Sequence, residues 1–352
     1  MPRTLRLPRS KRTYARLAFP DRLANTRNAG GFTLIELLVV MMIIAILASM
    51  VSFAMFRSQQ TARKAATQAL ITKLHSVIAR QWDTYATRRI QWDPTATPAS
   101  TSGMDPHDAA QFELAALRQL TRLELPNRWE DVSNGVTALN NTNPDFPYLT
   151  SPETPPTLAL PALTQAYGAY GSGTDEHQGA ECLYMIVSFI ADDDLDRINL
   201  FSEGEVGDED GDGKNEFHDA WGNPIRFLRG PMGFVDPNPS DPAWGHLSDL
   251  QTADSAGSPD PFDPRGVDTR GTWAIYPLIY SAGPDQTYDI YTGTGSSDDP
   301  YAGIDQTHTP MGTTGTQIGA PLDASNAQVA PDNGKLNHHD NIHNHRLGGS
   351  LR

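Results

Sequence analysis

The chain has 352 residues, enough for one large or two small domains, with 27 basic against 42 acidic residues. Residues 1–31 carry a net charge of +7, which leaves −22 for the remainder. An acidic body repels phosphate backbones, which argues against nucleic acid as a partner. The single cysteine, Cys182, excludes an intrachain disulfide framework and a CxxC redox or zinc pair.

An uncharged apolar segment follows the basic leader. Residues 37–56 (LLVVMMIIAILASMVSFAMF) contain twenty residues without a charge, and a helix of that length spans the hydrocarbon core of about 30 Å. We therefore predict a transmembrane helix over residues 32–56. Eight basic residues precede it, and only Arg57, Arg63 and Lys64 follow closely. The positive-inside rule then places the N-terminus in the cytoplasm and the body across the membrane.

The residues at the edge of this segment carry a resemblance. The small residues Ala29-Gly30-Gly31 stand before the apolar run, whereas a secretory signal peptide has them after it. The string GGFTLIELLVVMMIIAILASMV resembles the class III signal of type IV pilins and of the pseudopilins of type II secretion. The resemblance implies that prepilin peptidase removes residues 1–31 by cutting between Gly31 and Phe32, and that it methylates the new N-terminal amine.

One acid, Glu36, lies inside the apolar boundary. A carboxylate that enters lipid is costly unless it is paired. The resemblance implies that Glu36 pairs with the N-terminal amine of a neighbouring subunit during assembly. Each charge is expensive alone and tolerable with its partner, so the pair would also set the register of assembly. The alternative is an ordinary single-pass anchor with a glutamate at the membrane interface.

Residues 57–93 continue the helical pattern without glycine and with no proline before 94. Apolar residues recur at three- and four-residue spacing, which predicts an amphipathic helix with one stripe: Ala62, Ala66, Ala69, Leu70, Leu74, Val77, Ile78, Trp82 and Tyr85. Together with the membrane segment it forms one predicted helix from about Thr33 to Ile90, ended near Pro94. Many relatives have a glycine and a proline where Ala45 and Phe53 stand, so we expect a straighter helix here. The stripe is also compatible with a coiled-coil partner.

The middle of the chain changes composition twice. Residues 94–175 are rich in Pro, Thr, Ser, Ala and Asn, which indicates a variable insertion over the body, with one predicted helix at Asp108–Leu123. Residues 176–302 are assigned to a globular body. It begins with a dense apolar run, Glu176–Ile190, predicted to be a short helix or strand with Cys182 as a buried apolar residue.

Short strand-like runs alternate with turns from Ala220 onward: NPIRFL, TWAIYPLIYSAG and TYDIYTG. We therefore expect an α+β fold, in which a long N-terminal helix packs on a small antiparallel sheet with loop-rich insertions. The strings DAWGNPIRF and PLIYSAGPDQTYDIYTG resemble the C-terminal sheet of the major pseudopilin of type II secretion, where a serine-containing loop holds calcium. The resemblance covers less than half of the chain.

An acidic loop, DEDGDGKNEFHD, spans residues 208–219. Its acids take positions 1, 3, 5, 9 and 12 of an EF-hand calcium loop, with Gly213 at position 6: Asp208, Asp210, Asp212, Glu216 and Asp219. Asp at position 12 has a shorter reach than the usual Glu. The sequence favours calcium here, because so many like charges repel one another without a cation. The alternative is a solvated acidic loop.

A second calcium candidate is implied by the resemblance. The loop Ser281–Asp285 matches the family's calcium loop, with Asp285 and the later Asp298 as ligands, although the spacing to Asp298 departs from the family. Without a disulfide, calcium would brace the body. Residues 303–352 form a polar tail with His338, His339, His343 and His345. Such a cluster can bind zinc or nickel, but its spacing favours a polar, partly ordered terminus.

The sequence therefore predicts a structural, non-enzymatic subunit of a type II secretion pseudopilus, in the inner membrane with a periplasmic body. Its expected partners are prepilin peptidase, other pseudopilin subunits, the inner-membrane assembly platform and membrane lipid. A type IV pilus subunit is the alternative within the class. A membrane-anchored periplasmic hydrolase with a catalytic metal is the alternative outside it, and the absence of GxSxG, HExxH or paired histidines near the acids argues against it.

Overall fold

The computed structural model describes most of the chain beyond the leader. Its described residues are 32–140, 146, 148–149, 154–174, 176–191, 201–234, 236–237, 245–246, 259–293, 301, 318–322 and 340–346. The chain divides into two compact units, residues 1–55 and residues 56–352, each of which is described by itself.

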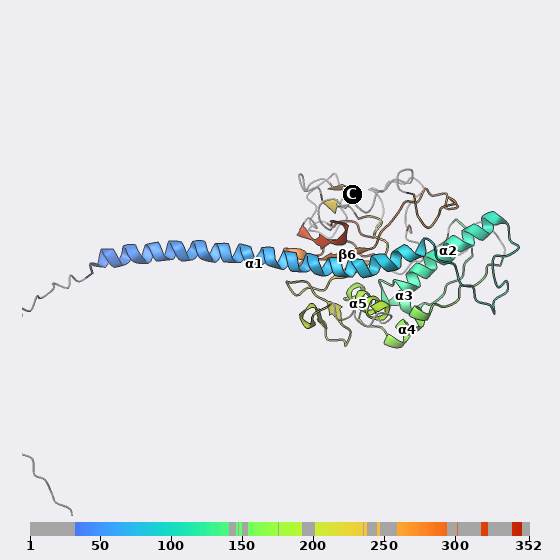
Figure 1. The fold of residues 1–352 in the computed structure, drawn as a ribbon, viewed down its shortest axis with the longest axis horizontal. Coiled ribbons are helices and arrows are strands. Elements are labelled where there is room, and N and C mark those ends of the chain that lie inside the picture. Colours follow the sequence, from blue (N-terminus) through green and yellow to red (C-terminus); the bar gives the residue numbers. More distant parts are fainter. Residues whose placement is uncertain are drawn as a thin grey trace, which may run out of the picture. The chain divides into compact units, whose positions relative to one another are not determined.

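Helix α1 runs from Leu34 to Tyr85 without interruption (Figure 1). No glycine or proline breaks it, as the sequence predicts. It ends before the predicted Ile90, because the amides of Thr87 and Arg88 bond three residues back. That turn places the Arg88 guanidinium on buried Glu124, at 2.5 and 2.6 Å. Residues 91–93 are then extended, and Trp92 pairs with Leu158 in an antiparallel bridge.

The apolar stripe of α1 is buried only in its C-terminal part. Leu70, Leu74, Val77, Ile78, Trp82 and Tyr85 all belong to the main core cluster. The stripe residues Ala62, Ala66 and Ala69 lie on the same helix but are exposed. The buried face begins instead at Thr67, whose Oγ1 accepts a hydrogen bond from the amide of Ala220 at 3.0 Å.

In the described residues, four further α-helices precede the sheets: α2 (Pro106–Glu124), α3 (Trp129–Ser133), α4 (Ala162–Tyr170) and α5 (Gln178–Ala191). Asp105 caps α2 by accepting the amide of His107, and Pro106 occupies the first helical position. The region 94–175 is more than a covering insertion, because Phe112, Trp129 and Tyr167 lie in the same core cluster as α1. The run Glu176–Ile190, for which the sequence predicts a helix or a strand, is helical from Gln178 onward as α5.

The strands are short and antiparallel. β3 (Arg226–Leu228), β6 (Leu278–Ser281) and β7 (Ile342–His343) form one sheet in the order β3-β6-β7, with Phe227 opposite Ile279. β1 (Val206–Gly207) pairs with β2 (Glu216–Phe217), and β4 (Asp236–Pro237) pairs with β5 (Gly245–His246). Of the predicted strand TYDIYTG, only Ile290 pairs, in an isolated bridge with Pro321. The architecture is the expected α+β arrangement.

Part of the histidine-rich tail belongs to this sheet. His343 and His345 are buried, at 5% and 1% exposure, and Asn344 accepts the amide of Ile279 through Oδ1 at 2.8 Å. Asn344 Nδ2 also donates to the carbonyl of Pro277 at 2.9 Å. The expected polar terminus is therefore an integral edge of the body over residues 341–345, and His338 and His339 lie outside the described residues.

Candidate functional site

The N-terminus of α1 is closed by its own side chains. Glu36 accepts hydrogen bonds from the amide and the hydroxyl of Thr33, both at 2.8 Å, and the amide of Glu36 donates to Thr33 Oγ1 at 3.3 Å. This reciprocal pattern is a capping box, which satisfies free donors at the start of a helix. The T-x-x-E spacing of Thr33 and Glu36 is the signal in the sequence for this cap.

The surroundings of this cap are apolar and exposed. Phe32 is 83% exposed, and the large apolar side chains that follow from Leu34 to Phe56 are exposed as well. Glu36 is the only charged residue between Leu34 and Phe56. α1 is long and apolar enough to cross a membrane in this region. The processing residue Gly31 lies outside the described residues.

The second candidate site is the acidic loop between β1 and β2. Pairing of Gly207 with Glu216 closes the loop into a hairpin. Asp208 organises it by accepting the amides of Gly211 and Gly213, at 2.8 and 3.0 Å. Gly213 has φ +89°, which permits the sharp turn. The hairpin therefore brings the carboxylates of Asp208, Asp210 and Asp212 close together.

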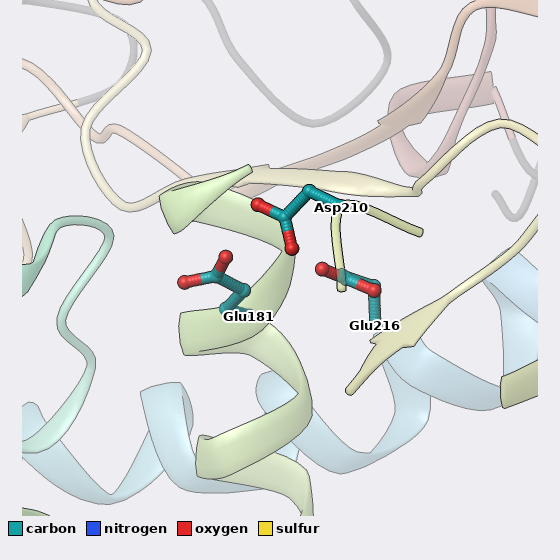
Figure 2. A group of neighbouring side chains, drawn as sticks. All are labelled: Glu181, Asp210 and Glu216. Carbon is teal, nitrogen blue, oxygen red and sulfur yellow. The ribbon is translucent and has the colours of Figure 1, made fainter. Parts of the chain in front are cut away.

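Two groups of carboxylates result, and Asp210 belongs to both. Asp208, Asp210 and Asp212 have oxygens within 4.8 Å of one another. Asp210 and Glu216 also meet Glu181 of α5, again within 4.8 Å (Figure 2). Glu181 is not among the ligands predicted from the sequence, because it lies within an apolar run. The signal available in the sequence is that it is a single acid within such a run.

Glu181 and Glu216 are fully buried. Burial, with the charges of Asp212 and Asp210 adding to it, raises the pKa of Glu181 to about 8 against the hydrogen bond from Trp129 Nε1. Burial and the neighbouring aspartates likewise raise the pKa of Glu216 to about 7. Each carboxylate keeps one oxygen, Oε1, without a hydrogen-bond partner among the described residues. Among the described residues, no lysine or arginine forms an ion pair with either side chain, and His218 Nε2 lies 3.9 Å from Glu216 Oε2.

The remaining predicted ligands lie elsewhere. Asp219, expected at the twelfth loop position, is in neither group. Its Oδ1 accepts the amides of Trp221 and Asn223, and its Oδ2 accepts the hydroxyl of Ser281 at 2.6 Å. Asp285 is exposed, and its Oδ1 accepts the amide of Thr287 at 2.9 Å. Asp298 lies outside the described residues.

Comparison with known families gives one match. Residues 26–52 match the prokaryotic N-terminal methylation motif. No curated protein and no solved structure matches the chain. The matched segment contains the expected cleavage site, Glu36 and the apolar start of α1. Such a motif implies processing by prepilin peptidase and assembly with other pilin subunits. The chain thus has the N-terminal region of a type IV pilin-like prepilin, a membrane-anchored structural subunit and not an enzyme.

Proposed function

We propose that this protein is a subunit of a type II secretion pseudopilus, cleaved between Gly31 and Phe32 and N-methylated. The observation that carries the proposal is the methylation motif at residues 26–52, placed directly on a 52-residue helix whose first part is apolar and exposed. The leader would lie in the cytoplasm, α1 would anchor the chain in the inner membrane, and the body would be periplasmic.

Assembly would proceed through the exposed first part of α1. Glu36 would pair with the methylated amine of Phe32 in a neighbouring subunit, since a carboxylate among apolar side chains requires a counter-charge. The assembly platform and other pseudopilin subunits would supply the remaining contacts. The exposed apolar side chains would exchange lipid for neighbouring α1 helices.

The C-terminal body supports the pseudopilus over the type IV pilus. The turn Trp221–Pro224 leads into β3, which pairs antiparallel with β6, and β6 leads into the loop Ser281–Asp285. Asp219 joins the turn to that loop, because it accepts the Trp221 amide and the Ser281 hydroxyl. This is the order of elements on which the resemblance to the major pseudopilin depends.

The test is the intact mass and N-terminal sequence of the protein extracted from membranes. With active prepilin peptidase we expect a chain that begins at methylated Phe32, and without the peptidase the uncut precursor. A chain that retains Met1 beside an active peptidase would overturn processing. Deletion of the gene should then stop secretion of exported proteins. Loss of surface pili with normal secretion would identify a type IV pilus subunit instead.

A further inference from the structure

We propose that Glu181, Asp210 and Glu216 bind a calcium ion that joins helix α5 to the loop between β1 and β2. Their carboxylate oxygens approach one another within 4.8 Å, from three separate elements of the chain (Figure 2). Asp208 and Asp212 extend the group around Asp210. The proposal is independent of the role of the N-terminal motif, because every residue in it belongs to the body.

Two buried carboxylate oxygens indicate that this group binds a cation. Glu181 and Glu216 are both 0% exposed, and Oε1 of each has no hydrogen-bond partner in the described part of the chain. A buried carboxylate without a partner is strongly unfavourable unless a charge or a metal compensates it. Two such oxygens in one group are the environment that a divalent cation requires.

Within the described part of the chain, no lysine or arginine side chain compensates the charge of this group. Lys214, the basic residue of the loop, directs its ammonium to the carbonyl of Tyr170 at 2.6 Å and lies 4.2 Å from the centre of the Tyr170 ring. His218 Nε2 is 3.9 Å from Glu216 Oε2, beyond hydrogen-bonding distance, and its ion pairs among the described residues reach neither Glu181 nor Asp210. No lysine or arginine ion pair of the described residues involves the five carboxylates.

The donors identify the class of ion. All are oxygens, which suit the hard cations calcium and magnesium rather than zinc or copper. Calcium accepts irregular shells of six to eight oxygens, whereas magnesium demands a near-ideal octahedron and retains several waters. The loop provides the first, third, fifth and ninth ligand positions of a calcium loop. Glu181 of α5 contributes the carboxylate that Asp219, engaged elsewhere, does not.

A close cover limits the occupant to a small ion. The amide of Thr174 donates to Asp212 Oδ2 at 2.6 Å, and its hydroxyl donates to Asp210 Oδ2 at 2.5 Å. A Cβ added at Gly173 would meet Glu181 Oε2 and would lie 2.6 Å from Asp212 Oδ2. The segment before α5 therefore lies directly on the carboxylates, and a larger organic cation has no room there.

The experiment uses the full chain, purified in detergent and freed of metal by a chelator. Calcium chloride is titrated by calorimetry into the parent and into Glu181→Gln and Glu216→Gln. Each glutamine keeps the shape of the side chain and removes its charge. Glu209→Gln is the matched control, since Glu209 lies in the same loop but outside both groups. Asp285→Asn tests the second loop.

We expect the parent to bind calcium with a dissociation constant below about 1 mM. Each of the two glutamine variants should bind at least about tenfold more weakly, and both controls should bind as the parent does. Three results would overturn the proposal: no calcium binding by the parent, unchanged binding in both glutamine variants, or loss of binding in Asp285→Asn alone. Methylation at Phe32 is unaffected by any of them, so failure here and failure of the proposed function are distinguishable.

Two further readouts keep the test decisive if a variant is poorly folded. Terbium, a calcium substitute, should emit on excitation of tryptophan, because Trp129 Nε1 donates to Glu181, and calcium should displace it. Trp129→Phe should remove most of this emission while leaving calcium binding measurable. In chelator, the two glutamine variants should unfold at or above the temperature of the parent, since a neutral amide beside the aspartates costs less to bury than an acid without a metal. Lower unfolding temperatures in chelator would contradict an uncompensated buried charge.

Discussion

The first and last parts of α1 share one helix but have opposite surroundings. Leu47 is 57% exposed, whereas Leu74 is fully buried in the core of the body. Both segments are rich in good helix formers, so local propensity does not separate them. The two parts differ in how apolar side chains are distributed around the helix: the first part is apolar on all sides, and the last part is apolar on one face only. The side chains of the first part need lipid or other chains to bury them, whereas the apolar face of the last part is buried by its own chain.

The largest expected effect concerns the first part. Glu36→Ala should reduce assembly to background, because the pairing charge is lost, while cleavage after Gly31 continues. Assembly can be measured by cross-linking and shear-fraction analysis in cells, with N-terminal sequencing to follow processing. Assembly at the parental level would rule out the pairing mechanism.

A matched pair of leucines tests the comparison directly. Leu74→Ala should lower the free energy of unfolding of the body by about 2–5 kcal/mol, because it opens a cavity in the core. Leu47→Ala removes the same atoms from an exposed position, so the body should be unaffected. All six tryptophans lie after residue 56, so their fluorescence in detergent reports on the body. Equal losses in the two variants would show that the halves are not distinct.

Acid should act on the body through Asp268. Burial alone would raise the pKa of Asp268, but hydrogen bonds from Arg270 and the charges of Arg118 and Arg270 lower it to about 2. Its stabilising contribution, present above pH 3.8, is lost as the pH falls towards 2. The loss is about 2 kcal/mol. Asp268→Asn should be less stable at pH 7 and should lose less on acidification, as measured by denaturant titration at each pH.

The smallest expected effect on stability concerns the residue at which the buried face of α1 begins. Thr67→Val removes the buried hydroxyl that accepts the amide of Ala220 and should cost about 1 kcal/mol. Thr61→Val is the control, because the Thr61 hydroxyl is exposed and bonds only to its own helix, at Arg57. A similar loss in both would mean that helix propensity, not the contact with Ala220, sets the cost.

The parts of the fold that sequence analysis predicted depend on local patterns. The apolar helix, the helix at α2 and the methylation motif each follow from residues that are close in the chain. Spacing likewise anticipated that Asp208, Asp210 and Asp212 would converge.

The missed features depend on contacts between distant segments. Glu181 meets Asp210 only because α5 packs beside the hairpin, and nothing near Glu181 indicates an acidic partner. Asp219 accepts a hydrogen bond from Ser281, 62 residues away, and does not join the carboxylates of its own loop. His343 and His345 have a polar sequence context, yet pairing with β6 buries them. Periodicity does not encode such pairings.

The capping box at the start of α1 leaves Glu36 able to serve two partners at once. In the single chain the amide and the hydroxyl of Thr33 both donate to Oε2 of Glu36, and neither bond uses Oε1. In the proposed filament a neighbouring ammonium would therefore approach the same carboxylate without displacing the cap. The first turn of the helix would stay closed while another subunit compensates the charge of Glu36. Loss of this one side chain would then remove both the cap and the pairing.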